Sequence, residues 1–221
     1  MATISQAVTN DHRELEHSYN QIVNSTDHDH QERYGNQFTW ELARHSVGEE
    51  LVVYPAFEKH MGMRGHNMAE IDRKEHHHVS YPPHPFTHFH SPSTREVKDL
   101  LKEFQGMKPK NENYIPKLNE IWEKLSHHVK EEEQHDLPRL ESALSPEESH
   151  SMANSFGKTK AFVPTRSHPS AGEHPPFETV MGLMTAPMDH IADIFRKFPD
   201  KAVSPNPQRN RSLAKSIFGL V

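Results

Sequence analysis

The hydrophobic residues of the chain recur every three or four positions over long stretches, a spacing that places side chains on one face of a helix. The first stretch predicts a helix over residues 3–24. Its apolar positions are Ile4, Val8, Leu15, Tyr19 and Ile22. Residues 25–32 are polar and predict a turn, in which His28 and His30 would be solvated loop residues.

A longer stretch predicts a second helix over about residues 34–60. Its inward face mixes apolar and polar residues, namely Phe38, Leu42, His45, Glu49, Val52 and Ala56. A carboxylate on an otherwise apolar face is costly unless another group pairs with it. Pro55 should bend this helix because proline lacks a backbone N–H, and Gly62 and Gly65 should end it.

A third helix is expected to begin near His66 and to contain His76. It should stop at residues 80–93, which hold four prolines, and resume after a capping box of Ser93 and Glu96. If residues 79–95 are left out, His76 falls on one face with Val97, Leu100 and Phe104. We therefore interpret residues 79–95 as an insertion into one continuous helix.

The fourth predicted helix spans about residues 113–144. Its inward face carries Leu118, Ile121, Leu125, His128 and Glu132. His127 lies off this face by about a hundred degrees, so His128 is the better candidate for an inward role. His135, one turn beyond Glu132, is expected on the same face. It is the nearest residue that could supply protons to a ligand bound beside Glu132.

The pattern weakens beyond residue 146. Residues 146–176 have little periodicity and are expected to form a connector, and two short amphipathic pieces follow it. We expect these pieces to cover an open side of the helices; docking of a partner is the alternative.

The patterns together predict an all-α, antiparallel up-down-up-down four-helix bundle over residues 1–145. Residues 146–221 would be an extension that packs on the bundle and is mobile at its end.

One motif occurs twice, in HSVGEELVVYP at residues 45–55 and in HVKEEEQHDLP at residues 128–138. In each copy a glutamate follows the histidine by four residues and a proline follows by ten. Positions four apart share a helix face, so each copy directs an imidazole and a carboxylate the same way. Two such helices facing each other predict a metal site. A single copy could arise by chance among 20 histidines and 31 acidic residues, and a lone histidine is more often a hydrogen-bonded core residue. Two copies in phase with the apolar faces argue against chance.

Composition narrows the possible functions. The chain has no cysteine, which excludes disulfides, thiolate catalysis and iron–sulfur ligation. A net charge of −6 without a basic patch argues against nucleic-acid binding. No apolar run approaches the ~18–20 residues of a membrane helix, and no signal-peptide core follows Met1. We expect a cytoplasmic protein without a membrane or nucleic-acid partner.

The motifs DHREL (11–15), HSVGEELVVYP (45–55), KEHHHV (74–79) and HHVKEEEQHDLPRLE (127–141) resemble the hemerythrin-like HHE cation-binding family, over about residues 1–145. The extension resembles the tails of fungal members. The resemblance implies a four-helix bundle around a non-haem, carboxylate-bridged di-iron centre. Its implied ligands are His12, His45, Glu49, His76, His128 and Glu132, with the two glutamates bridging.

Hemerythrins carry a further histidine four residues beyond the one on the third helix, where this chain has Ser80. The fifth histidine ligand is therefore unassigned; His77, His78, water or a distant histidine could fill its place. The resemblance implies reversible capture of O₂ or a related diatomic such as NO, or of iron itself. The alternatives are a di-iron oxidase, peroxidase or nitric-oxide reductase in stress defence, and an iron-responsive interaction module. The same ligands would also accept zinc or manganese.

Overall fold

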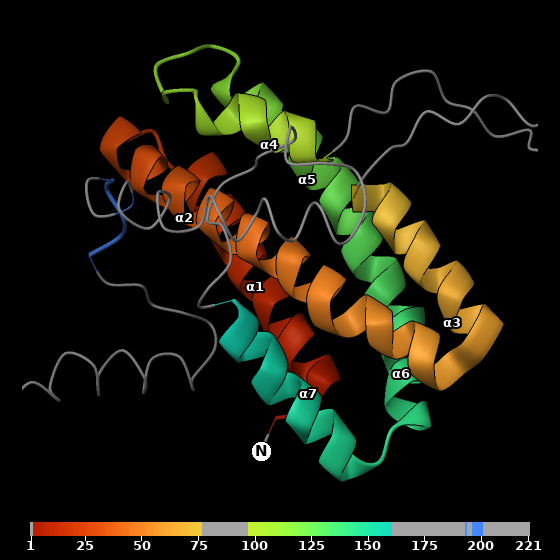
Figure 1. The fold of residues 1–221 in the computed structure, drawn as a ribbon. Coiled ribbons are helices and arrows are strands. Elements are labelled where there is room, and N and C mark those ends of the chain that lie inside the picture. Colours follow the sequence, from red (N-terminus) through yellow and green to blue (C-terminus); the bar gives the residue numbers. More distant parts are fainter. Residues whose placement is uncertain (1, 77–96, 161–192, 194–195, 201–221) are drawn as a thin grey trace, which may run out of the picture.

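The computed structural model describes residues 2–76, 97–160, 193 and 196–200, and the regular elements in these ranges are all helical (Figure 1). Seven α-helices and two π-helical turns follow one another in this part of the chain. They are α1 (Ile4–Val23), α2 (His28–Gly48), η1 (Glu49–Val53), α3 (Tyr54–His76), α4 (Val97–Gln105), α5 (Tyr114–Glu131), η2 (Glu132–Asp136), α6 (Leu137–Ala143) and α7 (Pro146–Thr159). The prediction of an all-α protein is confirmed for the described residues. None of the helices described could cross a membrane.

A short turn joins α1 to α2, and the two helices lie side by side. Thr3 caps α1 in a capping box with Gln6. Asp27 caps α2 by accepting a hydrogen bond from the backbone N–H of Asp29. The predicted turn at residues 25–32 is therefore too long: this cap starts α2 at His28, and both His28 and His30 are helical.

The predicted second helix passes through the π turn η1 just before Pro55. The N–H of Tyr54 bonds to the carbonyl of Glu49, five residues back, where a regular α-helix would use the residue four back. A proline ring collides with the carbonyl four residues before it in a regular helix, and a wider turn just ahead of Pro55 relieves that collision. The second copy repeats this arrangement, because the N–H of Leu137 bonds to the carbonyl of Glu132 just before Pro138.

Each π turn changes which later residues face inward, since it adds one residue to a turn of the helix. Within η1 the fully buried residue after Glu49 is Val53, whereas Val52, the predicted one, is only partly buried. In the second copy the next buried residue after Glu132 is Leu137, just past η2, and His135 inside the turn is exposed. The prediction that His135 lies on the inward face of the helix is wrong for this reason.

Helix α3 reverses direction at Gly62, and its second half runs back along the first (Figure 1). Gly62 has φ 57° and ψ −139°, a backbone conformation that glycine adopts without steric cost. Gly65 lies so close to the first half that an added Cβ would stand 1.8 Å from the carbonyl oxygen of Phe57. The predicted end at Gly62 is confirmed, but the next helical segment begins directly after it and not at His66.

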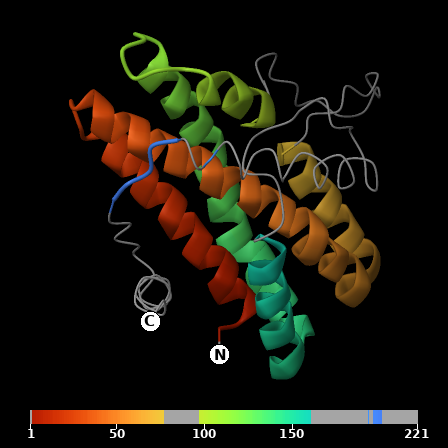
Figure 2. The same cartoon turned by 60° about the vertical axis from the view of Figure 1, so that its left-hand side comes forward.

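Helix α4 begins at Val97, where the sequence predicts that a helix resumes, and Figures 1 and 2 show it starting near the end of α3. Residues 77–96 lie outside the described residues. The capping box of Ser93 with Glu96 and the inferred insertion at 79–95 therefore stay predictions.

Two apolar clusters make up the core, one on each side of a layer of buried polar residues. Along α1, Ile4 and Val8 belong to one cluster and Leu15 and Ile22 to the other, with His12 between them. The same alternation holds on α2–η1 around His45 and Glu49, and on α5–η2 around His128 and Glu132. The apolar pattern thus places histidines and glutamates from three parts of the chain at one level of the core.

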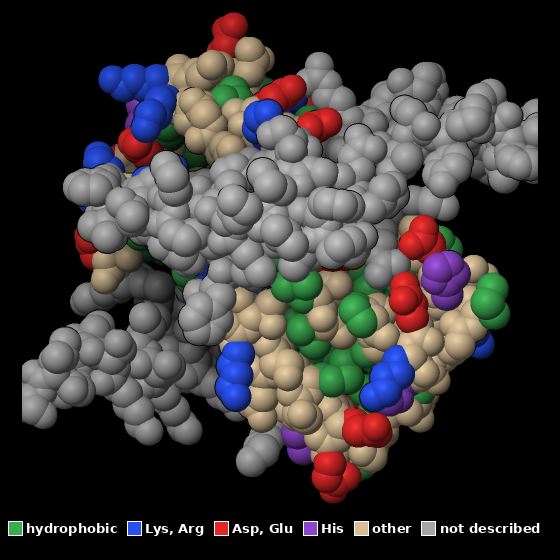
Figure 3. Space-filling view, in the orientation of Figure 1, with side chains coloured by type: hydrophobic (Ala, Val, Ile, Leu, Met, Phe, Trp, Pro, Cys, Tyr) green, Lys and Arg blue, Asp and Glu red, His purple; other side chains and the backbone are tan. Residues whose placement is uncertain are grey.

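Helix α7 occupies residues expected to form a connector, so that prediction is wrong over 146–159. Ser145 caps the helix in a capping box with Glu148, and Pro146 takes a first-turn position. The helix packs against α1 and η1, and Figure 2 shows it beside α1 near the amino terminus. Apolar side chains gather on the surface between α7 and the first half of α3 (Figure 3). A separate segment at 196–200 contacts α2, where Arg33 Nη1 donates to the carbonyl of Phe198 over 2.9 Å.

Candidate metal centre

The polar layer holds five of the six candidate ligands, and all five side chains are buried. The exposed fractions are 1% for His12, 0% for His45, 0% for Glu49, 4% for His128 and 1% for Glu132. The side chain of the sixth, His76, lies outside those the structure describes, as do His77, His78 and Ser80. The neighbouring His127 is exposed, which agrees with the preference for His128.

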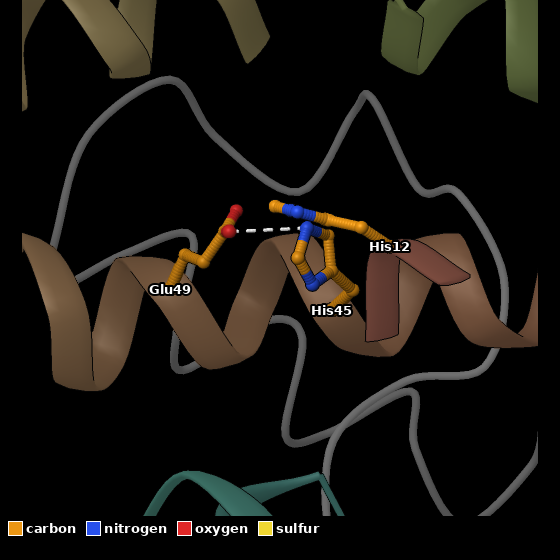
Figure 4. Close-up of side chains that lie close together, drawn as sticks. All are labelled: His12, His45 and Glu49. Atoms are coloured by element: carbon orange, nitrogen blue, oxygen red, sulfur yellow. Dashed lines mark ion pairs between the residues drawn. The ribbon is translucent and has the colours of Figure 1, made fainter. Parts of the chain in front are cut away.

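These side chains form two overlapping groups. In the first group, His12, His45 and Glu49 each offer a ligand atom within 4.8 Å of the other two (Figure 4). In the second group, Glu49, His128 and Glu132 meet the same criterion. Glu49 belongs to both groups, and its Oε1 lies 3.0 Å from His45 Nε2. Glu132 also reaches across, since its Oε2 lies 3.2 Å from His12 Nε2.

The two π turns begin at the two shared carboxylates. Glu49 is the first residue of η1 and Glu132 the first residue of η2. The last turns of α2 and α5 before them are regular, so each histidine and the glutamate four residues later share a face. The two glutamates therefore lie at the level of the histidines, and the wide turn begins at each of them.

Carboxylates also hold the outer nitrogens of two histidines. His12 Nδ1 lies 2.8 Å from Glu133 Oε1, and His45 Nδ1 lies 3.5 Å from Asp11 Oδ2. The His12 contact is a hydrogen bond, whereas the contact between Asp11 and His45 is at ion-pair distance. Both rings turn Nε2 toward the centre, where it approaches Glu132 and Glu49. A carboxylate on the outer nitrogen is the usual partner of a metal-bound histidine, because it fixes the ring and raises its basicity.

The buried charges shift one another's pKa values. Burial lowers the pKa of His45, but the charge of Glu49 and the contact with Asp11 outweigh it and raise the pKa to about 10. For His12, burial is likewise outweighed by its contacts with Glu132 and Glu133, so its pKa is raised. Burial would raise the pKa of Glu132, yet its contact with His12 holds the pKa down at about 2. The pKa of Glu49 is raised by burial and by the nearby charge of Glu132. Without a metal ion, protonated histidines therefore supply the positive charge of the layer.

The donor set fits a metal ion on a structural ground. His12 Nε2, His45 Nε2 and both carboxylate oxygens of Glu132 are buried and make no hydrogen bond to any described residue. Buried polar atoms without hydrogen bonds cost free energy, and a bound cation would satisfy all of them at once. Imidazole and carboxylate donors together suit iron, zinc and manganese.

Sequence reasoning missed Asp72, on the second half of α3. Its side chain is 3% exposed, and Oδ2 has no hydrogen-bond partner among the described residues. Burial raises its pKa to about 8, although the nearby His128 acts in the opposite direction. A signal for it was present, because Asp72 stands four residues before His76 and thus on the same helix face. Asp72 stands in the run DRKEHHH, whose composition is typical of a solvated charged segment, so the sequence did not single out this residue.

A groove of about 250 Å³ opens on the surface beside this layer. Its lining includes Arg13, Trp122, Lys130 and Glu133. Glu133 joins the groove to the centre, because the same carboxylate bonds to Arg13 Nη2 over 2.5 Å and to His12. The groove thus ends one side chain away from a candidate ligand.

Comparison with known proteins gives two matches. A model of the hemerythrin HHE cation binding domain matches residues 3–140, which include all the candidate ligands. An uncharacterized hemerythrin-like protein of Schizosaccharomyces pombe is 51% identical over 199 residues, covering 90% of this chain and 89% of that protein. No solved structure matches the chain. Helix α7 lies beyond the part that the family model matches.

Proposed function

The chain belongs to the hemerythrin HHE cation-binding family, and from this premise we propose that its polar layer binds two iron ions. The observation that carries the proposal is the overlap of the two ligand groups at Glu49. A single carboxylate within reach of two groups of donors can bridge two metal ions. Glu132 supports the same reading, because it lies with His128 and also approaches His12 across the core.

We infer the arrangement of the bundle from the same layer. The four rods would be α1, then α2 with η1 and the first half of α3, then the second half of α3 with α4, then α5 with η2 and α6. Successive rods run in opposite directions, as in an up-down-up-down bundle. His76 would then approach the second metal ion from the third rod.

The protein residues have three tasks in this proposal. Glu49 and Glu132 supply negative charge to both metal positions, while His12 and His45 give up their protons when a metal ion binds. Asp11 and Glu133 hold the imidazole rings through Nδ1. The apolar clusters on either side exclude water from the layer. When bound, a pair of ferrous ions supplies the electrons for reversible binding of O₂ or a related diatomic such as NO.

Small ligands have a short path to this centre. The groove between α1 and α5 reaches Glu133, so only that side chain separates its floor from His12 in the layer. A movement of this one half-buried carboxylate would open enough room for a diatomic molecule to pass. This supports capture of a small gas rather than of a large substrate.

One observation favours the enzymatic alternative, an oxidase, peroxidase or nitric-oxide reductase. Such reactions consume protons, and the predicted donor His135 is exposed and pairs with Glu131 at the surface. Asp72 is a better donor, because a buried carboxyl group with a pKa of about 8 keeps its proton at neutral pH.

The spectrum of the reduced protein under O₂ separates carrier from enzyme. We expect anaerobic iron-loaded protein to be nearly colourless, to develop absorption in the near-ultraviolet and visible when O₂ is admitted, and to bleach again under argon. An enzyme would instead consume O₂ continuously in the presence of a reductant. Protein that binds zinc alone and stays colourless throughout would refute both functions.

A further inference from the structure

Helix α7 covers the metal-binding layer from outside the part of the chain that the family model matches. Phe156 is 1% exposed, and its ring meets that of His45 edge-on, with 6.3 Å between centroids and 88° between planes. Gly48 makes this approach possible. A Cβ at Gly48 would stand 2.7 Å from Phe156 Cε2 and 3.3 Å from Lys160 Cγ.

The residue that follows α7 reaches the layer through charge. The ammonium group of Lys160 pairs with Asp11 Oδ2, the same oxygen that faces His45 Nδ1 at 3.5 Å. His45 Nε2 in turn lies 3.0 Å from Glu49 Oε1. A continuous line of contacts therefore runs from Lys160 through Asp11 and His45 to the carboxylate shared by both ligand groups.

The position of Lys160 is fixed at several points. Its side chain is 12% exposed and its ammonium group lies 5.3 Å from the centre of the Phe156 ring. Its carbonyl accepts a hydrogen bond from Arg44 Nε over 2.6 Å, and Arg44 lies over the ring of Trp40 at 3.7 Å. Held in this way, the ammonium group has one carboxylate within reach, that of Asp11, in the described part of the chain.

From this geometry we propose that Lys160 is a positioning residue of the metal centre, which acts through Asp11 to orient His45. The proposal rests on the proposed function, since it concerns a ligand of the same centre. The Asp11 carboxylate fixes the His45 ring with Nε2 inward, and Lys160 fixes the carboxylate. Without Lys160, Asp11 is free to turn toward solvent, and His45 loses the partner that orients it. The centre would then depend on a helix outside the family domain.

Zinc affinity of full-length variants tests the proposal without reference to activity. Lys160→Met keeps the aliphatic stem against Gly48 and Phe156 and removes only the charge. Loss of an outer partner of a metal-bound histidine typically weakens metal binding by ~10–100-fold. We expect that loss for Asp11→Asn, roughly a tenfold loss for Lys160→Met, and a near-normal dissociation constant for Lys160→Arg. Lys158→Met, which removes the same charge from an exposed site on the same helix, is the matched control.

The double variant distinguishes positioning from a merely structural role. If Lys160 acts through Asp11, Lys160→Met should not weaken zinc binding further in the Asp11→Asn background. Equal losses in both backgrounds, or unchanged affinity in Lys160→Met, would overturn the proposal while leaving the metal centre intact. Parent protein that binds neither zinc nor iron would overturn the proposed function, and this proposal with it.

Discussion

Metal uptake should release protons, because two of the candidate ligands carry them in the metal-free protein. The pKa of His45 is raised to about 10 and that of His12 above its ordinary 6.5. A histidine must be neutral at the ligating nitrogen, so each ring gives up a proton to bind a metal ion. At pH 6.5 we expect one proton from His45 and more than half a proton from His12 for each protein loaded. Glu49, whose pKa is also raised, would add to this number where it is protonated.

The magnitude follows from the number of protons. Each released proton changes the binding free energy by about 1.4 kcal/mol per pH unit, so two protons give about 2.7 kcal/mol, or nearly a hundredfold in the dissociation constant. Metal ions compete with protons, so affinity rises with pH. The slope should be near two below the pKa of His12, and near one from there to about pH 10, where His45 loses its proton.

Calorimetry measures this number directly. Zinc is titrated into metal-free protein at pH 6.5 in buffers with different ionisation enthalpies, and the slope of apparent enthalpy against buffer enthalpy gives the protons released. His127→Ala is the control, because His127 is exposed and its loss should leave the number unchanged. Tight binding with no proton release would refute the assignment of His12 and His45 as ligands.

Two further variants test the part of the chain predicted as the third helix, one at Asp72 and one that deletes residues 79–95. Asp72→Asn should stabilise the metal-free protein more at pH 8.5 than at pH 5. The native state keeps the Asp72 proton up to about pH 8, whereas the unfolded chain releases it near pH 3.8, so the free energy of unfolding falls as the pH rises between these values. The asparagine has no proton to release and removes that loss of stability. Equal changes in melting temperature at both pH values would contradict this. Deleting residues 79–95 should keep or raise both iron content and melting temperature, and a large loss of either would show that the segment is part of the native fold.

Much of the fold was predictable, because apolar spacing records which residues of a helix face the core. It predicted helices close to α1 and α5 and gave the level at which His45 and His128 lie. The doubled motif then indicated a metal site with no knowledge of the packing. These features depend on residues close together in sequence.

The errors come from features that depend on more distant contacts or on unusual backbone. A π turn leaves no mark in the apolar pattern, and each one moved the buried position further along the chain, from Val52 to Val53 and from His135 to Leu137. The proline after each glutamate was the available clue. Helix α7 was missed because Phe156 is its one fully buried large side chain, although Ser145 and Glu148 form a capping box. The burial of Asp72 depends on α3 folding back at Gly62, which its charged surroundings do not suggest.

The metal content of Glu49→Ala tests most directly whether Glu49 is shared by two metal ions. Protein from iron-replete cells should contain two iron atoms per chain, measured by elemental analysis against amino-acid content. Glu49→Ala should lose nearly all of both, because its carboxylate belongs to both ligand groups, whereas His127→Ala should keep both. Glu49→Ala that keeps two iron atoms, or a parent protein with one, would contradict the account.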